Sequence, residues 1–302
     1  MTGLGALVRR NTKIYFKDKG MFFTSLITPI ILLVLYVTFL ANVYEDSFRS
    51  ALEMAGASVS EKVIWGCVGG QLVSSLLAVI CVTVAFCSNL LMVQDKITGA
   101  RRDMTVSPVT SGTLAMGYYL ATMLSTLLVC LTAMVVCLGY LAYVGWFLTV
   151  GDVLALFLDV ILLVLFGTAL SSCVNFPLST NGQASAVGTI ISAGYGFVCG
   201  AYMPVSSFSE GVQKVISFLP GTYGTSLLRN HAMRGAFEEM SRQGFPAEVV
   251  KGIRDGVDCN IYFWGNQVEE WTMYVILIAA IVVVVGIYVL LNLLSRKKHH
   301  GR

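Results

Sequence analysis

The chain has 302 residues, of which 56% are hydrophobic and only 12% are charged, and its formal net charge is +3. Soluble domains carry roughly 25% charged residues, so this composition excludes an ordinary water-soluble fold. The basic residues are not gathered on one face with interleaved aromatic side chains, which argues against nucleic-acid binding. The composition therefore predicts an integral membrane protein.

The first predicted element is an amphipathic helix within residues 1–20. At about 100° per residue, its apolar side chains fall on one arc and Arg9, Arg10, Lys13 and Lys17 fall on the opposite arc. Such a helix lies in the plane of the lipid headgroups. Two roles stay open for it, a topology anchor or a docking surface for a partner.

Six apolar runs are each long enough to cross a bilayer, which takes about 20 helical residues. Because unpaired backbone groups are costly in hydrocarbon, each run is predicted to be helical. The runs are Met21–Val43, Ile64–Val93, Leu114–Phe147, Val153–Val174, Ala184–Met203 and Met273–Leu294. The predicted fold is thus an all-α integral membrane protein with six transmembrane helices, of which residues 21–203 hold the first five.

Basic residues near the ends of the spans set the predicted orientation. The segment before the first span, the loop at residues 94–113 and the C-terminal tail are rich in Lys and Arg, whereas the short loops on the other side carry few. Cytoplasmic loops are enriched in these residues. Both termini are therefore predicted to be cytoplasmic, with the chain in the plasma (inner) membrane.

The loop at residues 94–113 mixes both signs of charge. A short helix capped by Thr98 or Gly99 and stopped at Pro108 is expected there. The alternative is an ordinary loop that is basic only because it is cytoplasmic. The candidate contact residues of this loop are Asp95, Lys96, Gly99, Arg101, Arg102, Asp103, Ser107 and Pro108.

One acidic residue, Asp159, falls inside the fourth span. An acid at the centre of a membrane helix costs about 2.5–3.5 kcal/mol, and such residues are often functional. No second intramembrane acid or basic partner is evident in the sequence, and a proton relay usually needs one. A structural pairing, or exposure to a cavity, is favoured over proton transport.

Small residues recur at a spacing of four in the fifth span, at Gly188, Ser192, Gly196 and Gly200. They share one helix face, where small side chains let two helices approach closely. Packing within the chain and a dimer seam are both open as explanations.

Two short apolar stretches follow the fifth span, and each is too short to cross a membrane. Residues 204–235 are therefore predicted to form an external re-entrant helical hairpin, which contains Pro204, Pro220, Tyr223 and Arg229. Residues 236–270 form a polar external insertion that contains Cys259, for which no disulfide partner is evident. Residues 271–302 hold the last span and a basic cytoplasmic tail.

No enzymatic motif is evident in the sequence. It contains no HExxH, GxSxG, CxxC or GxxxxGK[ST] pattern, and no cysteine has the spacing of a metal ligand. No catalytic residue, metal site or cofactor is therefore expected in this chain. If the chain uses ATP to move a substrate, the ATPase is another polypeptide.

The order of these elements resembles the type-2 ABC (ABC-2) exporter permeases over nearly the whole chain. The loop Asp95…Thr98-Gly99…Ser107-Pro108 is similar to an acidic-Lys-x-x-Gly-Thr…Pro pattern of that family. The stretch from Gly200 to Arg229 resembles its Gly…Pro…Leu-x-Pro-x-x-Tyr…Arg signature. Two departures are Ala100-Arg101-Arg102, where the family usually has Thr and then an acidic residue, and the long insertion.

The resemblance implies a permease that exports an amphiphilic substrate: a drug, as in multidrug exporters, a lipid-linked molecule or a hydrophobic peptide. It implies a homodimer, or a heterodimer with a related permease, and a separate cytoplasmic ABC ATPase that binds ATP and Mg²⁺. The loop Asp95–Pro108 would be the coupling helix, seated on that ATPase beside the N-terminal helix, and spans one, two and five would line the path. The hairpin would gate the external end of that path, with Pro204, Pro220, Tyr223 and Arg229 as the candidate gate residues. Two other classes stay open: a proton-coupled secondary transporter that uses Asp159, and a membrane receptor or immunity protein.

Overall fold

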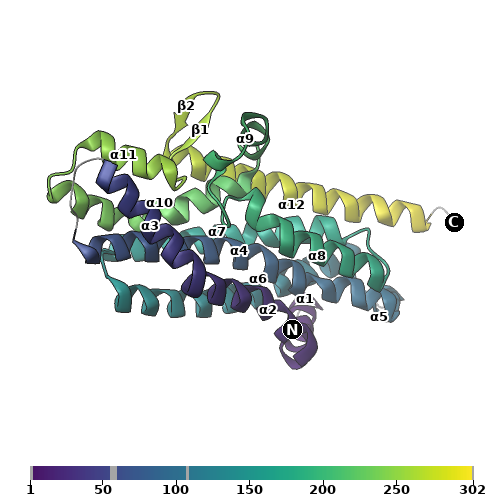
Figure 1. Cartoon of the computed structure of the whole chain (residues 1–302). Coiled ribbons are helices and arrows are strands. Elements are labelled where there is room, and N and C mark those ends of the chain that lie inside the picture. The colour runs from purple at the N-terminus through teal and green to yellow at the C-terminus, as the bar shows by residue number, and fades with distance from the viewer. Residues whose placement is uncertain (1–2, 55–59, 107–108, 301–302) are drawn as a thin grey trace.

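The computed structural model describes residues 3–54, 60–106 and 109–300. Within these ranges the chain is a bundle of long helices that run side by side along one axis (Figure 1), and its one sheet is a two-stranded hairpin. The all-α fold class predicted from the sequence is confirmed.

The first half of the bundle comprises α1 (Gly3–Lys17), α2 (Lys19–Leu35), a π-helical turn (Tyr36–Leu40), α3 (Ala41–Met54), α4 (Glu61–Ile97), α5 (Ala100–Val106) and α6 (Ser111–Val144). The second half comprises α7 (Val150–Asn175), α8 (Asn181–Val198), a 3₁₀ turn (Val205–Ser207), α9 (Glu210–Ile216), α10 (Pro220–Arg242), α11 (Ala247–Gly256), β1 (Ile261–Phe263), β2 (Asn266–Val268) and α12 (Glu270–His300).

Among the described residues, five helical stretches are long and apolar enough to cross a membrane. They are Ser25–Ser50, Glu61–Ile97, Ser111–Val144, Val150–Asn175 and Glu270–Leu294. They correspond to predicted spans one to four and six. The fifth predicted span is not among them, because α8 begins with Asn-Gly-Gln and ends at Val198, which leaves a short apolar stretch. A sixth crossing stays a prediction.

Helix α8 ends before the predicted boundary, in a Schellman motif. The N–H of Gly200 donates to the carbonyl oxygen of Phe197 at 3.2 Å, and the N–H of Ala201 donates to that of Gly196 at 2.8 Å. Gly200 has a φ of +74°, a left-handed conformation that glycine adopts without a steric penalty. The helix therefore stops at Gly200 rather than at Pro204.

The second half of the predicted hairpin is a long helix. Pro220 occupies the first turn of α10, where its missing N–H costs nothing, and the helix continues past Arg229 to Arg242. Most of its side chains are buried against α4 and α7. The boundary expected between residues 235 and 236 therefore falls inside one helix, and a re-entrant hairpin stays a prediction.

Helix α4 is the centre of the bundle, packed against α2, α6, α7, α8 and α10. It approaches α10 closely at Gly70, where an added Cβ would lie 2.8 Å from the backbone oxygen of Ala232 and 2.6 Å from Cγ of Met233. Small residues permit such close contact between membrane helices. The spacing of α4 and α10 therefore depends on this glycine.

We expect Gly70→Ala to destabilise the bundle by about 1–3 kcal/mol, because the new methyl group must displace backbone. The matched control is Gly139→Ala in α6, whose added Cβ would meet nothing within 4 Å. Thermal unfolding in detergent measures both variants. Equal melting temperatures for the two would contradict the close α4–α10 contact.

Candidate functional site

The loop after α4 contains the expected short helix, α5. The carbonyl oxygen of Gly99 accepts hydrogen bonds from the N–H groups of Arg102 at 2.8 Å and Asp103 at 3.3 Å, so the helix starts at this glycine. Gly99 has a φ of +83°, which turns the chain sharply between α4 and α5. Thr98 is the C-cap of α4, and the predicted end of the helix at Ser107-Pro108 lies outside the described residues.

Two cations of this loop are held against the end of α7. The guanidinium carbon of Arg101 lies 5.6 Å from the ring centroid of Phe176, and Nζ of Lys96 lies 5.3 Å from the same ring. Lys96 also donates to the carbonyl oxygens of Phe176 and, at 2.9 Å, Leu178. These contacts fix the base of the loop to the bundle.

Arg102 and Asp103 are exposed on α5. No hydrogen bond from either side chain, and no ion pair, is found within the described part of the chain. They are the two predicted contact residues that the structure leaves open to a partner.

Asp95, the first predicted contact residue, is buried and paired with α1. Arg10 donates to it with both terminal nitrogens, Nη1 to Oδ2 at 2.7 Å and Nη2 to Oδ1 at 3.1 Å, and the Tyr118 hydroxyl donates to Oδ2 at 2.7 Å. The carboxylate raises the pKa of Arg10 above its usual value. Bidentate Arg–carboxylate pairs fix geometry as well as charge. The hydrogen bonds of Arg10 and Tyr118 to Asp95 therefore join α1, α6 and α4 at one point.

The sequence did not show this pairing, since it predicts lipid or a partner protein as the contact of Arg10 and a partner protein as the contact of Asp95. The signal available was a carboxylate at the end of a long apolar run, which needs a nearby cation when it is buried. Helix α1 is amphipathic as predicted, but its buried face packs on α6. Leu7 lies so close to α6 that a Cβ at Gly117 would be 2.9 Å from it.

Helices α2, α4 and α8 enclose a groove of about 610 Å³. These are the helices of predicted spans one, two and five. Gly188 and Ser192 line the groove, whereas Gly196 makes room for the ring of Tyr202 and Gly200 ends the helix. The predicted small-residue stripe therefore has three different local roles.

Arg229, a predicted gate residue, is buried where α10 meets the segment around Asp258 and the turn at Gly200. Its Nη1 lies 3.1 Å from Asp258 Oδ2, and its Nη2 donates to the carbonyl oxygen of Gly200 and, at 3.3 Å, to Ser75 Oγ. The N–H of Val205 donates to the same carboxylate at 2.7 Å. Burial raises the pKa of the Asp258 carboxyl, against the opposing effect of Arg229.

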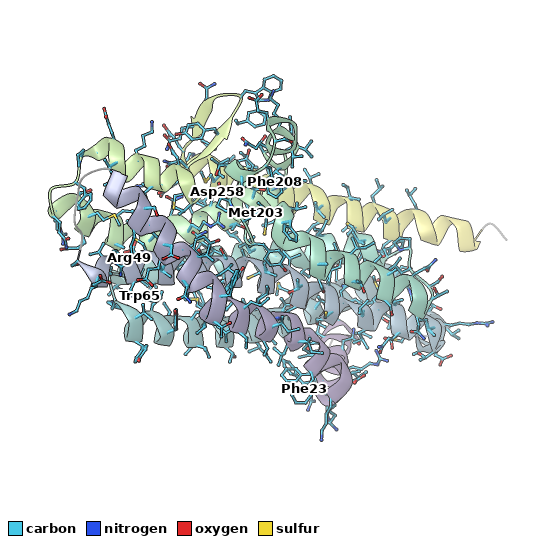
Figure 2. The ribbon with its side chains drawn as sticks, viewed as in Figure 1. Phe23, Arg49, Trp65, Met203, Phe208 and Asp258 are labelled. Atoms are coloured by element: carbon cyan, nitrogen blue, oxygen red, sulfur yellow. The ribbon has the colours of Figure 1, made fainter. Side chains whose placement is uncertain are left out.

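The other predicted gate residues do not all lie at this contact. Pro204 precedes the 3₁₀ turn, and Pro220 starts α10. The Tyr223 hydroxyl donates to the carbonyl oxygen of Ser217 at 2.5 Å, which ties α10 back to the end of α9. In Figure 2, the labelled Met203, Phe208 and Asp258 lie together at the base of α9 and the β-hairpin. Pro204 and Arg229 thus lie at the contact with Asp258, whereas Pro220 and Tyr223 lie where α9 meets α10.

Asp159 has partners, and the expectation that it stands alone is wrong. Its Oδ2 lies 2.6 Å from His231 Nδ1, and its Oδ1 accepts a hydrogen bond from the Tyr274 hydroxyl at 2.7 Å. All three side chains come from different helices, α7, α10 and α12. Sequence reasoning missed His231 because it lies within residues 204–235, which the sequence predicts as an external hairpin rather than as part of the bundle.

The polar network continues toward the start of α12. Arg234 bridges Asp152 at 3.3 Å and Glu270 at 3.0 Å, and His231 Nε2 lies 4.0 Å from Glu270. Asp152 is buried, whereas the side chain of Glu270 is 40% exposed. The network therefore opens to the surroundings at Glu270.

Residues 67–295 match a family model described as ABC-2 family transporter protein. This range covers most of the chain, from within α4 to within α12. The chain belongs to the ABC-2 transporter family. The resemblance drawn from the loop and gate motifs is thereby confirmed, and the protein is a multi-pass membrane permease of an ABC transporter. A search of curated proteins found no match.

Cys259 of the permease is buried and its thiol is unpaired among the described cysteines. Its carbonyl oxygen accepts hydrogen bonds from Ser226 Oγ at 2.9 Å and from Asn230 Nδ2 at 2.5 Å. The backbone of this residue therefore connects the segment between α11 and β1 to α10, next to the Arg229–Asp258 pair.

Removing one partner of the Arg229–Asp258 pair should be costly, since it leaves a buried charge uncompensated. We expect Asp258→Ala to lose about 3–5 kcal/mol of stability, whereas the double variant Arg229→Met, Asp258→Leu should lose much less. Thermal unfolding in detergent reports both. If Asp258→Ala is as stable as the double variant, the ion pair does not stabilise the fold.

Proposed function

We propose that this ABC-2 permease is the membrane subunit of an exporter driven by ATP hydrolysis on a separate cytoplasmic subunit. The observation that carries the proposal is that α5 is exposed while the end of α4 next to it is fixed to the bundle. Its Arg102 and Asp103 are open to a partner, while Arg10, Asp95 and Lys96 fasten the surrounding backbone. A rigid support is needed if the displacement of α5 by an ATPase is to move the long helices.

Asp95 and Lys96 act as positioning residues in this proposal. Because both are engaged within the chain, the surface offered to the ATPase consists of α5 and the exposed side of α1. ATP and Mg²⁺ bind on the partner, with both permease termini on its side of the plasma membrane. Helix α1 is then more than a topology anchor.

An amphiphilic substrate suits the groove between α2, α4 and α8. Its walls combine apolar side chains such as Ile27 and Leu90 with uncharged polar ones such as Gln94 and Thr189. Of its lining residues none carries a formal charge. A drug, a lipid-linked molecule or a hydrophobic peptide fits this chemistry better than a highly charged polymer.

A second permease copy would complete the groove. One side of α8 is open in the single chain, with Ile190 67% exposed and Phe197 48% exposed. The groove itself is bordered by only three helices. In a dimer with an identical or a related copy, the grooves of the two copies would face each other and enclose the path between them.

The test is affinity purification of the permease after expression with the genes adjacent to its own. We expect an ATPase subunit in stoichiometric amount, which is lost when Arg102 and Asp103 are both changed to Ala. The matched control is Arg242→Ala with Glu238→Ala, an exposed pair of opposite charges on α10, which should retain the subunit.

Purification of the folded permease without any ATPase would contradict the proposal. Retention of the ATPase by the Arg102, Asp103 double variant would place the contact elsewhere.

Proton-coupled transport is the second candidate, because Asp159 pairs with His231 inside the bundle. Both carboxylate oxygens are occupied by side chains of the chain, and the network reaches the surroundings through Glu270 at one end. No internal inverted repeat, typical of secondary transporters, is evident in the sequence. The geometry favours a structural brace. A receptor or immunity protein would likewise lack an ATPase partner.

The second candidate predicts that reconstituted permease alone moves substrate with protons and that Asp159→Asn abolishes this movement. Our expectation is the opposite: no proton-linked transport by the chain alone, and a lowered melting temperature for Asp159→Asn. Fluorescence of a pH-sensitive dye in proteoliposomes measures the first and thermal unfolding the second.

A further inference from the structure

A second groove, of about 410 Å³, lies between α2, α4 and α6, outside the proposed transport path. Its three walls are represented by Leu33 of α2, Leu76 of α4 and Val136 of α6. Along α6 the groove extends from Leu128 to Tyr140, about 18 Å at a rise of 1.5 Å per residue. The hydrocarbon core of a bilayer is about 30 Å thick, so the groove is close to one leaflet in depth.

Aromatic rings surround one end of this groove, at the elbow between α1 and α2. Phe16 and Phe22 line the groove. The rings of Tyr15 and Phe16 are 5.1 Å apart and those of Phe22 and Phe23 are 5.6 Å apart, and Figure 2 shows Phe23 projecting outward at this elbow. Aromatic side chains gather at the membrane–water interface. The elbow therefore marks the level of the headgroups.

A hydrogen bond fixes the elbow. The hydroxyls of Tyr15 and Ser25 are 2.7 Å apart and buried, which holds the last turn of α1 against α2. The position of the aromatic rings at the mouth of the groove is thus fixed by a contact between α1 and α2.

Basic side chains follow on α1, directly beyond the aromatic rings. Arg9, Lys13 and Lys17 are spaced by four residues, so they form one stripe along the helix, and all three are exposed. Phe16 is adjacent to Lys17 and one turn from Lys13. In the part of the chain that the structure describes, no ion pair neutralises the three cations. Asp18 is the acidic residue beside them.

We propose that this groove binds an anionic phospholipid of the cytoplasmic leaflet. An acyl chain lies between α2, α4 and α6, and the phosphate lies on the stripe of Arg9, Lys13 and Lys17. The order of the surfaces (cations, then aromatic rings, then a dry apolar slot) is the order of chemical groups along a phospholipid. The orientation rests on the proposed function, which places α1 on the cytoplasmic side.

A bound lipid would also support the elbow that carries α1. Because α1 is joined to the end of α4 through Arg10 and Asp95, the lipid stiffens the same unit that the ATPase is proposed to contact. Anionic lipid is thus a structural ligand at the coupling end, separate from the exported substrate in the groove of α2, α4 and α8.

The test is native mass spectrometry of the purified permease, delipidated and then given phosphatidylglycerol or phosphatidylcholine with identical acyl chains. Each exposed Lys or Arg contributes to the attraction of anionic lipid, so we expect phosphatidylglycerol to bind at least roughly tenfold more tightly. The variant Ala133→Trp fills the groove and Lys13→Gln with Lys17→Gln removes charge. Both should lose most of the bound phosphatidylglycerol.

Two controls match these variants. Val135→Trp puts the same side chain on the exposed face of α6, outside the groove lining, and Lys251→Gln removes an exposed charge from α11; both should bind as the original chain does. Equal binding of the two lipids, or undiminished phosphatidylglycerol in Ala133→Trp or in the Lys13, Lys17 double variant, would overturn the proposal. If Ala133→Trp does not fold, the surface Lys variant decides. The assay needs no ATPase, so its failure is distinct from failure of the exporter proposal.

Discussion

The structure depends on one constraint, that a charge removed from water must meet its partner inside the bundle. An unpaired ion in the interior is far too costly to persist, and lipid offers no replacement for water. The permease meets this constraint with the pairs Asp159–His231 and Arg229–Asp258 on α10. Each pair joins α10 to a segment distant in the sequence, and together they hold α10 inside the helix bundle.

The two ends of the bundle are built in different ways. At the end that holds α10, this helix brings together charged groups of α7, α12 and the segment around Asp258, which braces that end. At the other end the pairing of Arg10 with Asp95 fastens α1 but leaves α5 exposed. Helix α4, unbroken from Glu61 to Ile97, connects both. In the proposed exporter, a motion received at α5 would reach the opposite end of the bundle through this helix.

The local features of this fold were predictable from the sequence. Long apolar runs identified five of the membrane helices, and the charged loop with its glycine identified α5. The end of α8 was placed too late, because the run of apolar residues continues past Gly200 and only the backbone shows its left-handed turn. Periodicity shows which face of a helix is apolar, but it does not show where a helix stops inside a continuous apolar segment.

The long-range pairs were not predictable, for a different physical reason. His231 is 72 residues from Asp159, and Arg10 is 85 residues from Asp95. A single sequence shows that a buried charge needs a partner, but which of several cations supplies it is decided by how the helices pack. The gate role of Pro204, Pro220, Tyr223 and Arg229 stays a prediction. The sequence also did not show that Arg229 pairs with Asp258, because that contact forms only when α10 packs inside the bundle.

The most direct measurement is a double-mutant cycle on Arg10 and Asp95 in the permease bound to its ATPase, with substrate-stimulated ATP hydrolysis as the readout. If the pair joins α1 to α4 as one unit that transmits motion, Arg10→Gln and Asp95→Asn each lower the stimulation of ATP hydrolysis. The double variant should then show no less stimulation than the more impaired of the two single variants. The coupling energy should be about 1.5–3 kcal/mol, as for other charged hydrogen bonds. Additive losses, or single variants with unchanged stimulation, would contradict the coupling of the ATPase through α1 and α4.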